Sequence, residues 1–406
     1  MRIATSTIFD QSVDAMNRQQ VQMLKTQQQI SANRRVLTPS DDPIASARAL
    51  EVSQADSINT QYGLNAQTAS SRLAQTDQAL GSIGDLLQSL RQNAITAGNG
   101  SFTAADRATV ANDVQSSYDQ LMGIANSTDG EGNYLFSGYQ VNVKPFVTTA
   151  TGVQYQGDDG QRLVQISSGR QIGVSESGAD IFTRVRASNG TFTVSAPTTN
   201  TGSGVYTQGT VTNPAAITGH QYRIAFTVTG TGTSAVTTYD VLDVTAGTTV
   251  ATAQPYTKDG AIAFDGMSLQ VDGDPANGDV VQIDPSTNQD IFKTISNLIA
   301  ALRAPATDAA STARLQNSLN DAIANLDQGL NNVNAVRAGV GTRERESDDL
   351  KATSDSLSVQ FKTNLSDLQD LDYAQAVSDL IQQQNSLTAA QKTFLQTAQL
   401  SIFNYL

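Results

Sequence analysis

Regular apolar periodicity at both ends of the chain is the feature that most constrains the fold. Near the N-terminus, apolar residues and glutamines follow alternating steps of four and three over residues 9–30. The same spacing returns over residues 373–398. This is the a/d pattern of helices that pack along their length. We therefore predict that the two ends of the chain form a helical pair.

The predicted contact residues of this pair are the apolar members of the two repeats. They are Phe9, Val13, Met16, Met23 and Ile30 at one end, and Tyr373, Val377, Leu380, Leu387, Phe394 and Ala398 at the other. Each repeat also contains two glutamines, and polar residues at such positions lower stability while they help to fix the register. We expect the pair to be marginal alone and to become ordered when neighbouring helices complete it.

The rest of the chain divides by composition. Further apolar periodicity predicts helices over residues 62–97, 104–126, 291–302, 315–340 and 350–371. Residues from about 140 to 285 are instead rich in Gly, Thr and Val with alternating apolar residues, which predicts strands. We expect a mainly α fold with a β-rich insert, in an elongated architecture of a terminal helix pair, a helical bundle with β-hairpins and an outer β domain.

Phase breaks in the periodicity set the expected domain boundaries. Residues 1–38 with 372–406 form the predicted inner helical pair, residues 39–186 with 286–371 the middle bundle, and residues 187–285 the outer β domain. Within the β-rich part we expect a hairpin at Asp265-Gly266, a turn at residues 230–234, and another hairpin that turns at Gly157–Gly160.

The stretch "LTPSDDPIASA" lies between the first predicted helix and the next one. Its two adjacent carboxylates suggest a metal or acid–base site, but neighbouring side chains on an extended segment diverge. The alternative is local: Asp42 caps a helix whose first residue is Pro43, and Asn33 ends the preceding helix in the left-handed conformation. We favour an inter-domain joint made by Asn33, Pro39, Asp42 and Pro43.

Composition excludes several classes of site. The chain has no Cys, no Trp and one His, and its formal net charge is −13, which argues against thiolate zinc sites, disulfides and a phosphate-binding face. No ordinary signal peptide is visible at the start, and no stretch approaches membrane-spanning length. We expect no enzyme activity, no catalytic or metal site and no cofactor.

Four local motifs favour structural interpretations. "DGDPANGD" at residues 272–279 lacks ligands that an EF-hand requires, so a turn between strands is favoured over calcium binding. We expect His220 in a loop or at a strand edge. "TGTGTS" lacks the context of a phosphate loop. The Arg343-Glu344-Arg345-Glu346 run is interpreted as a solvated helix face with i,i+3 and i,i+4 pairs.

Several longer segments resemble a known family. "MRIATSTIF", "RRVLTPSDDPIASARAL", "GNYLFSGYQ" and "AFDGMSLQVDGDPANGDVVQIDPSTNQDIFKTI" are similar to segments of the flagellar hook-associated protein 3 family, which belongs to the flagellin-related axial proteins. The resemblance covers essentially the whole chain and is weakest from about 187 to 255. One departure is Asn33, where the family commonly has Gly.

The resemblance implies a structural role at the junction between hook and filament. Its implied partners are identical subunits in a ring, hook-associated protein 1, flagellin, and an export chaperone at the C-terminal helix. It also implies an extracellular flagellar location reached by type III export without a cleaved signal peptide, with neither nucleic-acid binding nor membrane insertion. The alternatives are a flagellin filament subunit and a surface-displayed glycan-binding or hydrolytic outer domain.

Overall fold

A computed structural model describes residues 5–399, with side chains for all of these except residues 5, 6, 8, 233 and 397–399. The chain separates into two compact units. The first comprises Met1–Asn65 and Asp349–Leu406, and the second comprises Ala66–Asp348. The predicted three-layer division, with its inner boundaries at 38 and 372, differs from this division and stays a prediction.

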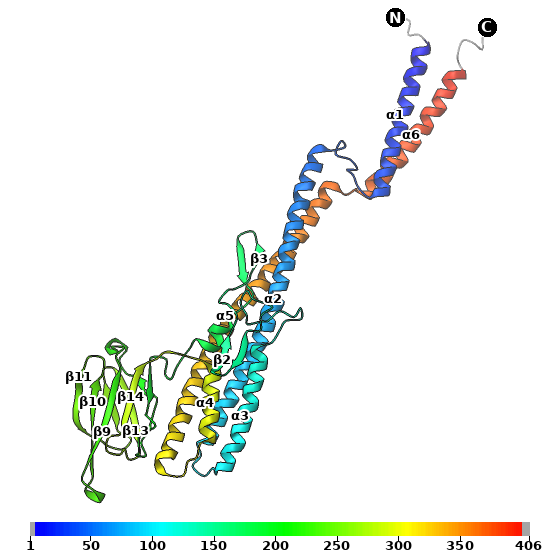
Figure 1. Cartoon of the computed structure of the whole chain (residues 1–406). Coiled ribbons are helices and arrows are strands. Elements are labelled where there is room, and N and C mark those ends of the chain that lie inside the picture. The colour runs from blue at the N-terminus through cyan, green and yellow to red at the C-terminus, as the bar shows by residue number, and fades with distance from the viewer. Residues whose placement is uncertain (1–4, 400–406) are drawn as a thin grey trace. The chain divides into compact units, whose positions relative to one another are not determined.

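Long helices build most of the first unit and the bundle of the second unit (Figure 1). They are α1 (Thr5–Ala32), α2 (Pro43–Ala97), α3 (Ala104–Ala125), α4 (Ile291–Arg303), α5 (Ala309–Gln369) and α6 (Tyr373–Gln399). The predicted helices are confirmed, but the two expected over 315–340 and 350–371 are parts of the single helix α5. The predicted phase break is also confirmed, because α5 ends at Gln369 and α6 begins at Tyr373. The expected mainly α fold with a β-rich insert is therefore correct.

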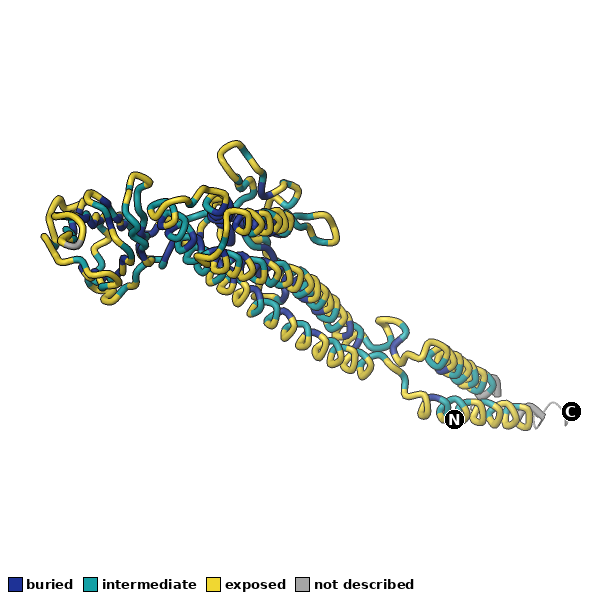
Figure 2. Tube along the Cα trace, turned by 90° about the horizontal axis from the view of Figure 1, so that it is seen from below, coloured by how far each residue is buried: buried dark blue, intermediate teal, exposed yellow. Residues whose placement is uncertain are grey.

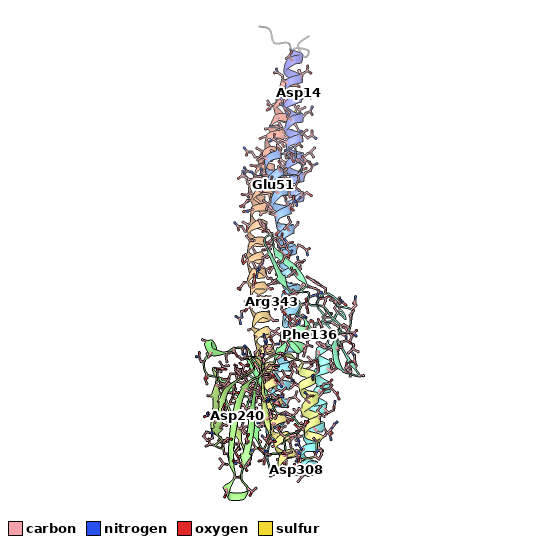
Figure 3. The ribbon with its side chains drawn as sticks, turned by 60° about the vertical axis from the view of Figure 1, so that its left-hand side comes forward. Asp14, Glu51, Phe136, Asp240, Asp308 and Arg343 are labelled. Atoms are coloured by element: carbon pink, nitrogen blue, oxygen red, sulfur yellow. The ribbon has the colours of Figure 1, made fainter. Side chains whose placement is uncertain are left out.

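One of the two hydrophobic cores of the second unit lies among its helices. The facing side of α2 buries Leu73, Leu80, Ile83, Leu87 and Leu90 completely or almost so. An aromatic cluster closes the core where the helices meet the first hairpins: Phe146 lies 5.0 Å from Phe182 and 5.3 Å from Phe292, centroid to centroid. Phe136, labelled in Figure 3, packs edge-on against Phe182 at 5.8 Å.

Two short hairpins follow α3, and their pairing differs from the prediction. β1 (Phe146–Thr149) pairs with β2 (Gly152–Tyr155), and β3 (Leu163–Ser167) pairs with β4 (Arg170–Gly173). The expected hairpin through Gly157–Gly160 is therefore wrong. The Asp158 carboxylate accepts hydrogen bonds from the Tyr139 and Gly160 amides, both at 2.8 Å, and holds this segment as a loop.

The Arg343–Glu346 run is also corrected. Arg343 forms an ion pair with Glu176, and Glu346 accepts two hydrogen bonds from Arg170 at 2.5 and 2.7 Å. These residues therefore tie the segment around β4 to α5 instead of forming only a solvated face. Local sequence spacing carries no information on such long-range partners, which is why the i,i+3 pattern was misleading.

Two packed sheets form the outer β region. The five-stranded sheet has the order β11-β10-β9-β14-β6, and the smaller sheet has the order β12-β13-β7 with β8 also on β13. The bounds are β6 (Phe192–Ser195), β7 (Val205–Tyr206), β8 (Thr210–Val211), β9 (Tyr222–Thr229), β10 (Val236–Asp243), β11 (Thr248–Pro255), β12 (Ala261–Phe264), β13 (Met267–Asp272) and β14 (Val280–Pro285). Inward-facing residues such as Ile224, Leu269 and Ile283 are buried between the sheets.

Short elements complete the chain. The strands β5 (Val185–Arg186) and β15 (Asn288–Gln289) pair where the chain enters and leaves the outer β region. The single-turn helices are η1 (Ala179–Thr183), η2 (Pro214–Ala216) and η3 (Gly232–Ser234). The hairpin at Asp265-Gly266 is confirmed, since both residues have positive φ, 43° and 77°, as a type I′ turn requires.

Three motifs of the outer β region, at residues 272–279, His220 and residues 230–234, adopt the structural roles predicted for them. Residues 273–279 connect β13 to β14, and Asp279 accepts hydrogen bonds from the Thr201, Gly202 and Ala276 amides, all at 2.9 Å. His220 lies in the loop before β9, where its Nδ1 is 2.7 Å from the Asp243 carboxylate. Residues 230–234 form the turn between β9 and β10.

We expect Phe182→Ala to destabilise the second unit by about 3–5 kcal/mol, because the Phe182 side chain is fully buried and its removal leaves a cavity. Urea unfolding followed by circular dichroism measures this. Leu163→Ala is the control, since Leu163 is 57% exposed and its truncation should change the unfolding free energy little. Equal effects of both changes would contradict the assigned core.

Candidate assembly interface

The terminal helices α1 and α6 form an antiparallel pair (Figure 1). At one end the rings of Phe9 and Phe394 meet edge to face, with centroids 5.4 Å apart. At the other end an antiparallel bridge joins Arg34 to Asp370. These two contacts fix the antiparallel register of the pair: residues early in α1 face residues late in α6, and residues late in α1 face residues early in α6.

The structure places seven of the eleven predicted contact residues along one line. Phe9, Met16, Met23 and Ile30 on α1, and Leu380, Leu387 and Phe394 on α6, are half-buried along the line where the helices meet. The positions between them are occupied by Ser12, Gln19 and Thr26 on α1 and by Gln383 and Ala390 on α6. The contact between α1 and α6 therefore shares every second position with the predicted repeat. At the positions in between, it uses the preceding residue, for example Ser12 instead of Val13.

The other predicted residues lie outside this contact. Val13 is 40% exposed and Tyr373 is 59% exposed, while Val377 is half-buried at the edge. Ala398 lies in α6, but its side chain is outside the part that the structure describes. Whether these residues take part in assembly therefore stays a prediction.

A polar layer interrupts the middle of the pair. The register places Gln19 opposite Gln383, between the Met16–Leu387 and Met23–Leu380 layers. The side-chain oxygen of each glutamine is buried and accepts no hydrogen bond from the described residues. Because a buried acceptor without a donor costs free energy, this layer weakens the isolated pair. The two repeats predicted polar residues in this contact, but the glutamines that belong to those repeats are Gln20, Gln27, Gln384 and Gln391, not Gln19 and Gln383.

Each terminal helix also carries a second apolar stripe. On α1 it contains Val13, Val21 and Leu24, and on α6 it contains Tyr373, Ile381 and Leu395, all exposed. At about 100° per residue these stripes are rotated roughly 100–130° from the intrachain contact. Figure 2 shows exposed residues along both helices. A helix with apolar residues on two faces is typical of packing between neighbours on two sides.

The first unit buries very little apolar surface. Among its described residues, the buried apolar ones are Val36, Ala45, Ala49 and Ala376. Its large exposed apolar side chains are Val13, Val21, Leu24, Ile44, Leu50, Ile58, Leu64, Leu357, Val359, Tyr373, Ile381 and Leu395. In this unit α2 and α5 meet through reciprocal hydrogen bonds, in which Asn59 donates to the Ser354 carbonyl and Ser354 donates to the Asn59 carbonyl, at 2.7 and 2.8 Å.

The segment between α1 and α2 has the local structure expected from its sequence. Asn33 adopts φ 51°, the left-handed conformation that ends a helix. The Asp42 carboxylate accepts a hydrogen bond from the Ala45 amide at 2.9 Å, and α2 begins at Pro43. Pro39 is exposed in a turn closed by the Asp41 amide and the Thr38 carbonyl, 3.0 Å apart. The inter-domain role of these residues stays a prediction.

Asp41 does more than sequence reasoning assigned to it. One carboxylate oxygen accepts hydrogen bonds from the Leu37 and Thr38 amides at 3.1 and 2.9 Å, and the other lies 2.7 Å from the Lys25 ammonium on α1. The Lys25 hydrogen bond and then the Thr38 amide hold the pKa of Asp41 far below its usual range. Asp41 therefore ties the linking segment to α1.

Arg35 ties the same segment to the end of α5. Its amide donates to the Gln369 carbonyl and its guanidinium to the Leu368 carbonyl, both at 2.8 Å. The guanidinium also lies 3.2 Å from Asp42. On the returning chain, Asp372 accepts from the Gln375 amide at 3.0 Å and so begins α6. The α1–α2 and α5–α6 connections thus each begin the next helix with an aspartate cap, and Arg35 holds the two connections together.

The described residues form no group of three or more His, Asp or Glu side chains that could hold a metal ion. No helix in the described part has the length and apolar character needed to cross a membrane. What the arrangement offers is a set of surfaces for packing. The expectation that the chain has no enzyme activity stays a prediction.

Comparison with known proteins identifies the class to which this architecture corresponds. A model of the bacterial flagellin N-terminal helical region matches residues 3–141. Flagellar hook-associated protein 3 of Salmonella typhimurium and that of Escherichia coli are each 26% identical over 404 residues, which is 99% of this chain and 99% of each relative. The fold is that of the flagellin-related axial proteins.

Solved structures agree with this result. FlgL of Xanthomonas campestris is 29% identical with a TM-score of 0.71, and the match covers 78% of this chain and 99% of that one. Flagellar hook associated protein-3 of Legionella pneumophila is 28% identical with a TM-score of 0.72, covering 78% and 98%. The resemblance to hook-associated protein 3 expected from the sequence motifs is confirmed.

We expect Asp41→Asn to loosen the segment between α1 and α2, because the neutral amide loses the Lys25 ion pair and one of its acceptor oxygens. Hydrogen exchange of the Leu37 and Thr38 amides should become severalfold faster. Since the pKa of Asp41 is depressed, its contribution is present above the usual pKa of an aspartate and is lost as the pH falls.

Ser40→Ala is the matched control for this change, since the Ser40 hydroxyl contacts only the Thr38 hydroxyl, at 2.8 Å, among the hydrogen bonds of this turn. If Ser40→Ala accelerates exchange as much as Asp41→Asn, the carboxylate is not the anchor of the segment.

Proposed function

We propose that this protein is a structural component of the bacterial flagellum that links the hook to the flagellin filament. The sequence resemblance to hook-associated protein 3 and the likeness to a flagellar junction protein, FlgL of Legionella pneumophila, support this function. That structure is 28% identical and covers 80% of this chain with a TM-score of 0.71. In this proposal the protein stacks on hook-associated protein 1 and presents a surface to flagellin.

The observation that carries the proposal is the distribution of apolar residues in the first unit. In its described part the large apolar side chains are exposed or half-buried except for Val36, and the other buried apolar residues are alanines. A unit of this kind gains little stabilisation from its own burial, at about 25 cal/mol per Å² of apolar surface removed from water. It gains more when identical subunits cover the exposed stripes of α1 and α6, so we infer self-assembly into a ring through the terminal helices.

The same surface explains the remaining proposed partners. Before assembly, a dedicated export chaperone would bind the exposed apolar stripe of α6 and shield it from water. We propose export through the flagellar type III channel without a cleaved signal peptide and an extracellular location in the flagellum. The inner, middle and outer layers, residues 1–38 with 372–406, 39–186 with 286–371, and 187–285, are proposed as radial layers of the assembled ring.

The proposed role is non-enzymatic, and a flagellin filament subunit is its nearest rival. Flagellin polymerises into long filaments, whereas a junction protein stops at a short ring. Immunogold labelling of intact flagella separates the two functions. Label confined to the boundary between hook and filament supports the junction role, and label along the filament overturns it.

We expect deletion of residues 380–406 to abolish filament attachment and to leave the second unit folded, because that unit has its own core and contains none of the deleted residues. Electron microscopy of cells in which the variant replaces the native chain measures attachment. Thermal melting of the purified variant checks the fold. Normal filaments on cells with the deletion would refute the proposed role of α6.

Leu387→Asp places a charge in the contact between α1 and α6. We expect it to impair filament attachment while the main thermal transition of the monomer changes little, because the core of the second unit lies elsewhere. Asn385→Asp is the control on the same helix, since Asn385 is exposed and the change introduces the same charge. A large loss of monomer stability in Leu387→Asp alone would show that the terminal pair is already a stable part of the monomer.

A further inference from the structure

The outer β region, residues 187–285, has a hydrophobic core of its own. That core contains residues such as Tyr222, Phe226 and Leu269 from the two packed sheets. The helical bundle of the second unit has another core, built from α2, α3, α4 and α5, and the two cores share no residue. The outer β region is therefore a separately packed body within the second unit.

A series of hydrogen bonds joins this region to α5. Polar side chains at successive turns of α5 bind main-chain atoms of the outer β region. Arg314 donates to the Asn200 carbonyl at 3.1 Å, and Asn320 donates to the Tyr206 carbonyl at 3.2 Å. Asn317 donates to the Gly204 carbonyl at 3.1 Å and accepts from the Tyr206 amide at 3.0 Å, while Asn325 accepts from the Ser188 amide at 2.7 Å. We call this set of contacts the α5 latch.

Asp321 lies at the centre of the α5 latch. Its carboxylate accepts hydrogen bonds from the Tyr206 hydroxyl, at 3.3 Å, and from the Gln208 side-chain amide. The Gln208 oxygen in turn accepts from the Ser188 hydroxyl at 2.5 Å. Protonated Asp321 fits the same partners, because it keeps one carbonyl oxygen for Gln208 and offers its own O–H to the Tyr206 hydroxyl.

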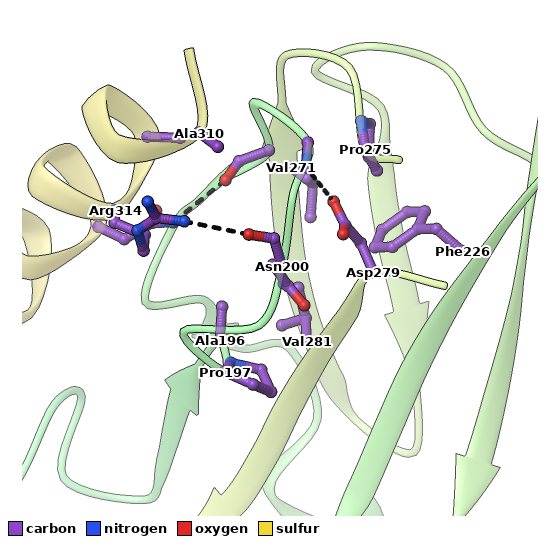
Figure 4. Close-up of a pocket in the computed structure, with 14 residues that line it drawn as sticks. Ala196, Pro197, Asn200, Phe226, Val271, Pro275, Asp279, Val281, Ala310 and Arg314 are labelled. Atoms are coloured by element: carbon purple, nitrogen blue, oxygen red, sulfur yellow. Dashed lines mark hydrogen bonds between the residues drawn. The ribbon is translucent and has the colours of Figure 1, made fainter. Parts of the chain in front are cut away.

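Apolar packing at the latch is loose. A cavity of about 20 Å³, enough for a single water molecule, lies between α5 and the outer β region, lined on the α5 side by Ala310 and Ala313 together with Arg314 and Asn317 (Figure 4). The same figure shows the Arg314 guanidinium directed at Asn200. Hydrogen bonds that water can replace cost less to separate than an apolar interface of the same size.

A short two-stranded stalk connects the two bodies. β5 pairs with β15, the Ala187 amide donates to the Thr287 carbonyl at 3.0 Å, and the Ser286 hydroxyl donates to the Ala187 carbonyl at 2.8 Å. Beyond this stalk, the chain enters and leaves the outer β region at adjacent points. Such a connection stays intact when the latch opens, so it can act as a hinge.

We propose that the outer β region is held against α5 by a releasable polar latch, which opens as a unit about the β5–β15 stalk while both cores stay folded. This inference goes beyond the proposed junction role and does not depend on it. The open state exposes the polar face of α5 and the short edge strand β7, whose backbone the latch residues cover when closed.

Proton binding at Asp321 favours the closed latch. Burial raises the pKa of Asp321 to about 7, against the opposing hydrogen bonds from Gln208 and Tyr206. The titratable group that faces it from the outer β region is Tyr206, and the nearby wall of α4 presents Thr294 and Asn297, which carry no charge. On α5 itself, Arg314 lies two turns away and binds Asn200.

The sign of the pH dependence follows from this raised pKa. In the open state Asp321 meets water and returns toward the ordinary aspartate pKa, so the closed state binds a proton that the open state releases. The closing constant should therefore fall by up to about tenfold per pH unit as the pH rises from roughly 4 to 7, and it should level off above that.

The absence of cysteine from the chain makes a distance measurement direct. Thr249→Cys on β11 and Ser116→Cys on α3 place one spin label on each body at exposed positions of the full chain. We expect one distance population at pH 5 and a second one that grows by pH 8. Adding Asn317→Ala should populate the second distance at both pH values, and adding Asp321→Asn should remove the pH dependence.

Asp327→Asn is the matched control, because Asp327 is also an acid on α5 but pairs with Arg91, 2.5 Å away, outside the latch. It should keep the pH response of the parent chain. A single unchanged distance population in the parent chain from pH 5 to pH 8 overturns the proton-linked latch, whether or not Asn317→Ala folds. A pH response that survives in Asp321→Asn overturns the role of Asp321.

Discussion

The contact between α1 and α6 is the interaction on which the architecture of the first unit depends. It joins the two ends of the chain, and its register is fixed by the Phe9–Phe394 rings at one end and the Arg34–Asp370 bridge at the other. Yet the contact is weak, because the Gln19–Gln383 layer leaves two buried side-chain oxygens without a donor among the described residues. Apolar residues that a stable pair would bury inward lie instead on a second, exposed face. The register of the pair is therefore well defined, while its stability is low. This combination fits the proposal that neighbouring helices complete the pair.

Polar contacts of the segment between α1 and α2 hold the described part of the first unit together where few apolar side chains are buried. Asp41 binds both its own loop and Lys25, and Arg35 reaches two carbonyls at the end of α5. Each of these contacts is exposed and individually weak, but together they bring the two chain connections to one place. A joint made from hydrogen bonds and ion pairs can form without a large buried surface. It can therefore be in place before the exposed stripes of α1 and α6 find partners.

Most of the secondary structure could be predicted because it is encoded locally. The restart of helices at Pro43 and Tyr373, the hairpin at Asp265-Gly266 and the left-handed Asn33 each follow from a few adjacent residues. Two predictions failed for different reasons. β2 pairs with its neighbour β1 across the short turn at residues 150–151 instead of with β3, whereas Arg343 and Glu346 bind distant residues of the segment around β4. The terminal repeats show a subtler limit. A 4-3 pattern lies on the border between the two apolar faces of α1, so periodicity alone could not tell inward residues such as Met16 from outward ones such as Val13.

The two ends of the chain and the outer β region show opposite solutions to the same physical problem. The outer β region buries a complete core and meets α5 through polar side chains, so its attachment can change without loss of fold. Within residues 5–399 the terminal pair contributes to neither hydrophobic core and exposes its apolar stripes, so in the proposed assembly its fold and its attachment depend on each other. In the proposed assembly the two properties are complementary, since neighbours would complete the terminal pair, while the outer β region has a core of its own. Gln19 and Gln383 in one contact and Asn317 and Asp321 in the other fit this division, because buried polar side chains without partners weaken the first contact, whereas hydrogen-bonded ones specify the second.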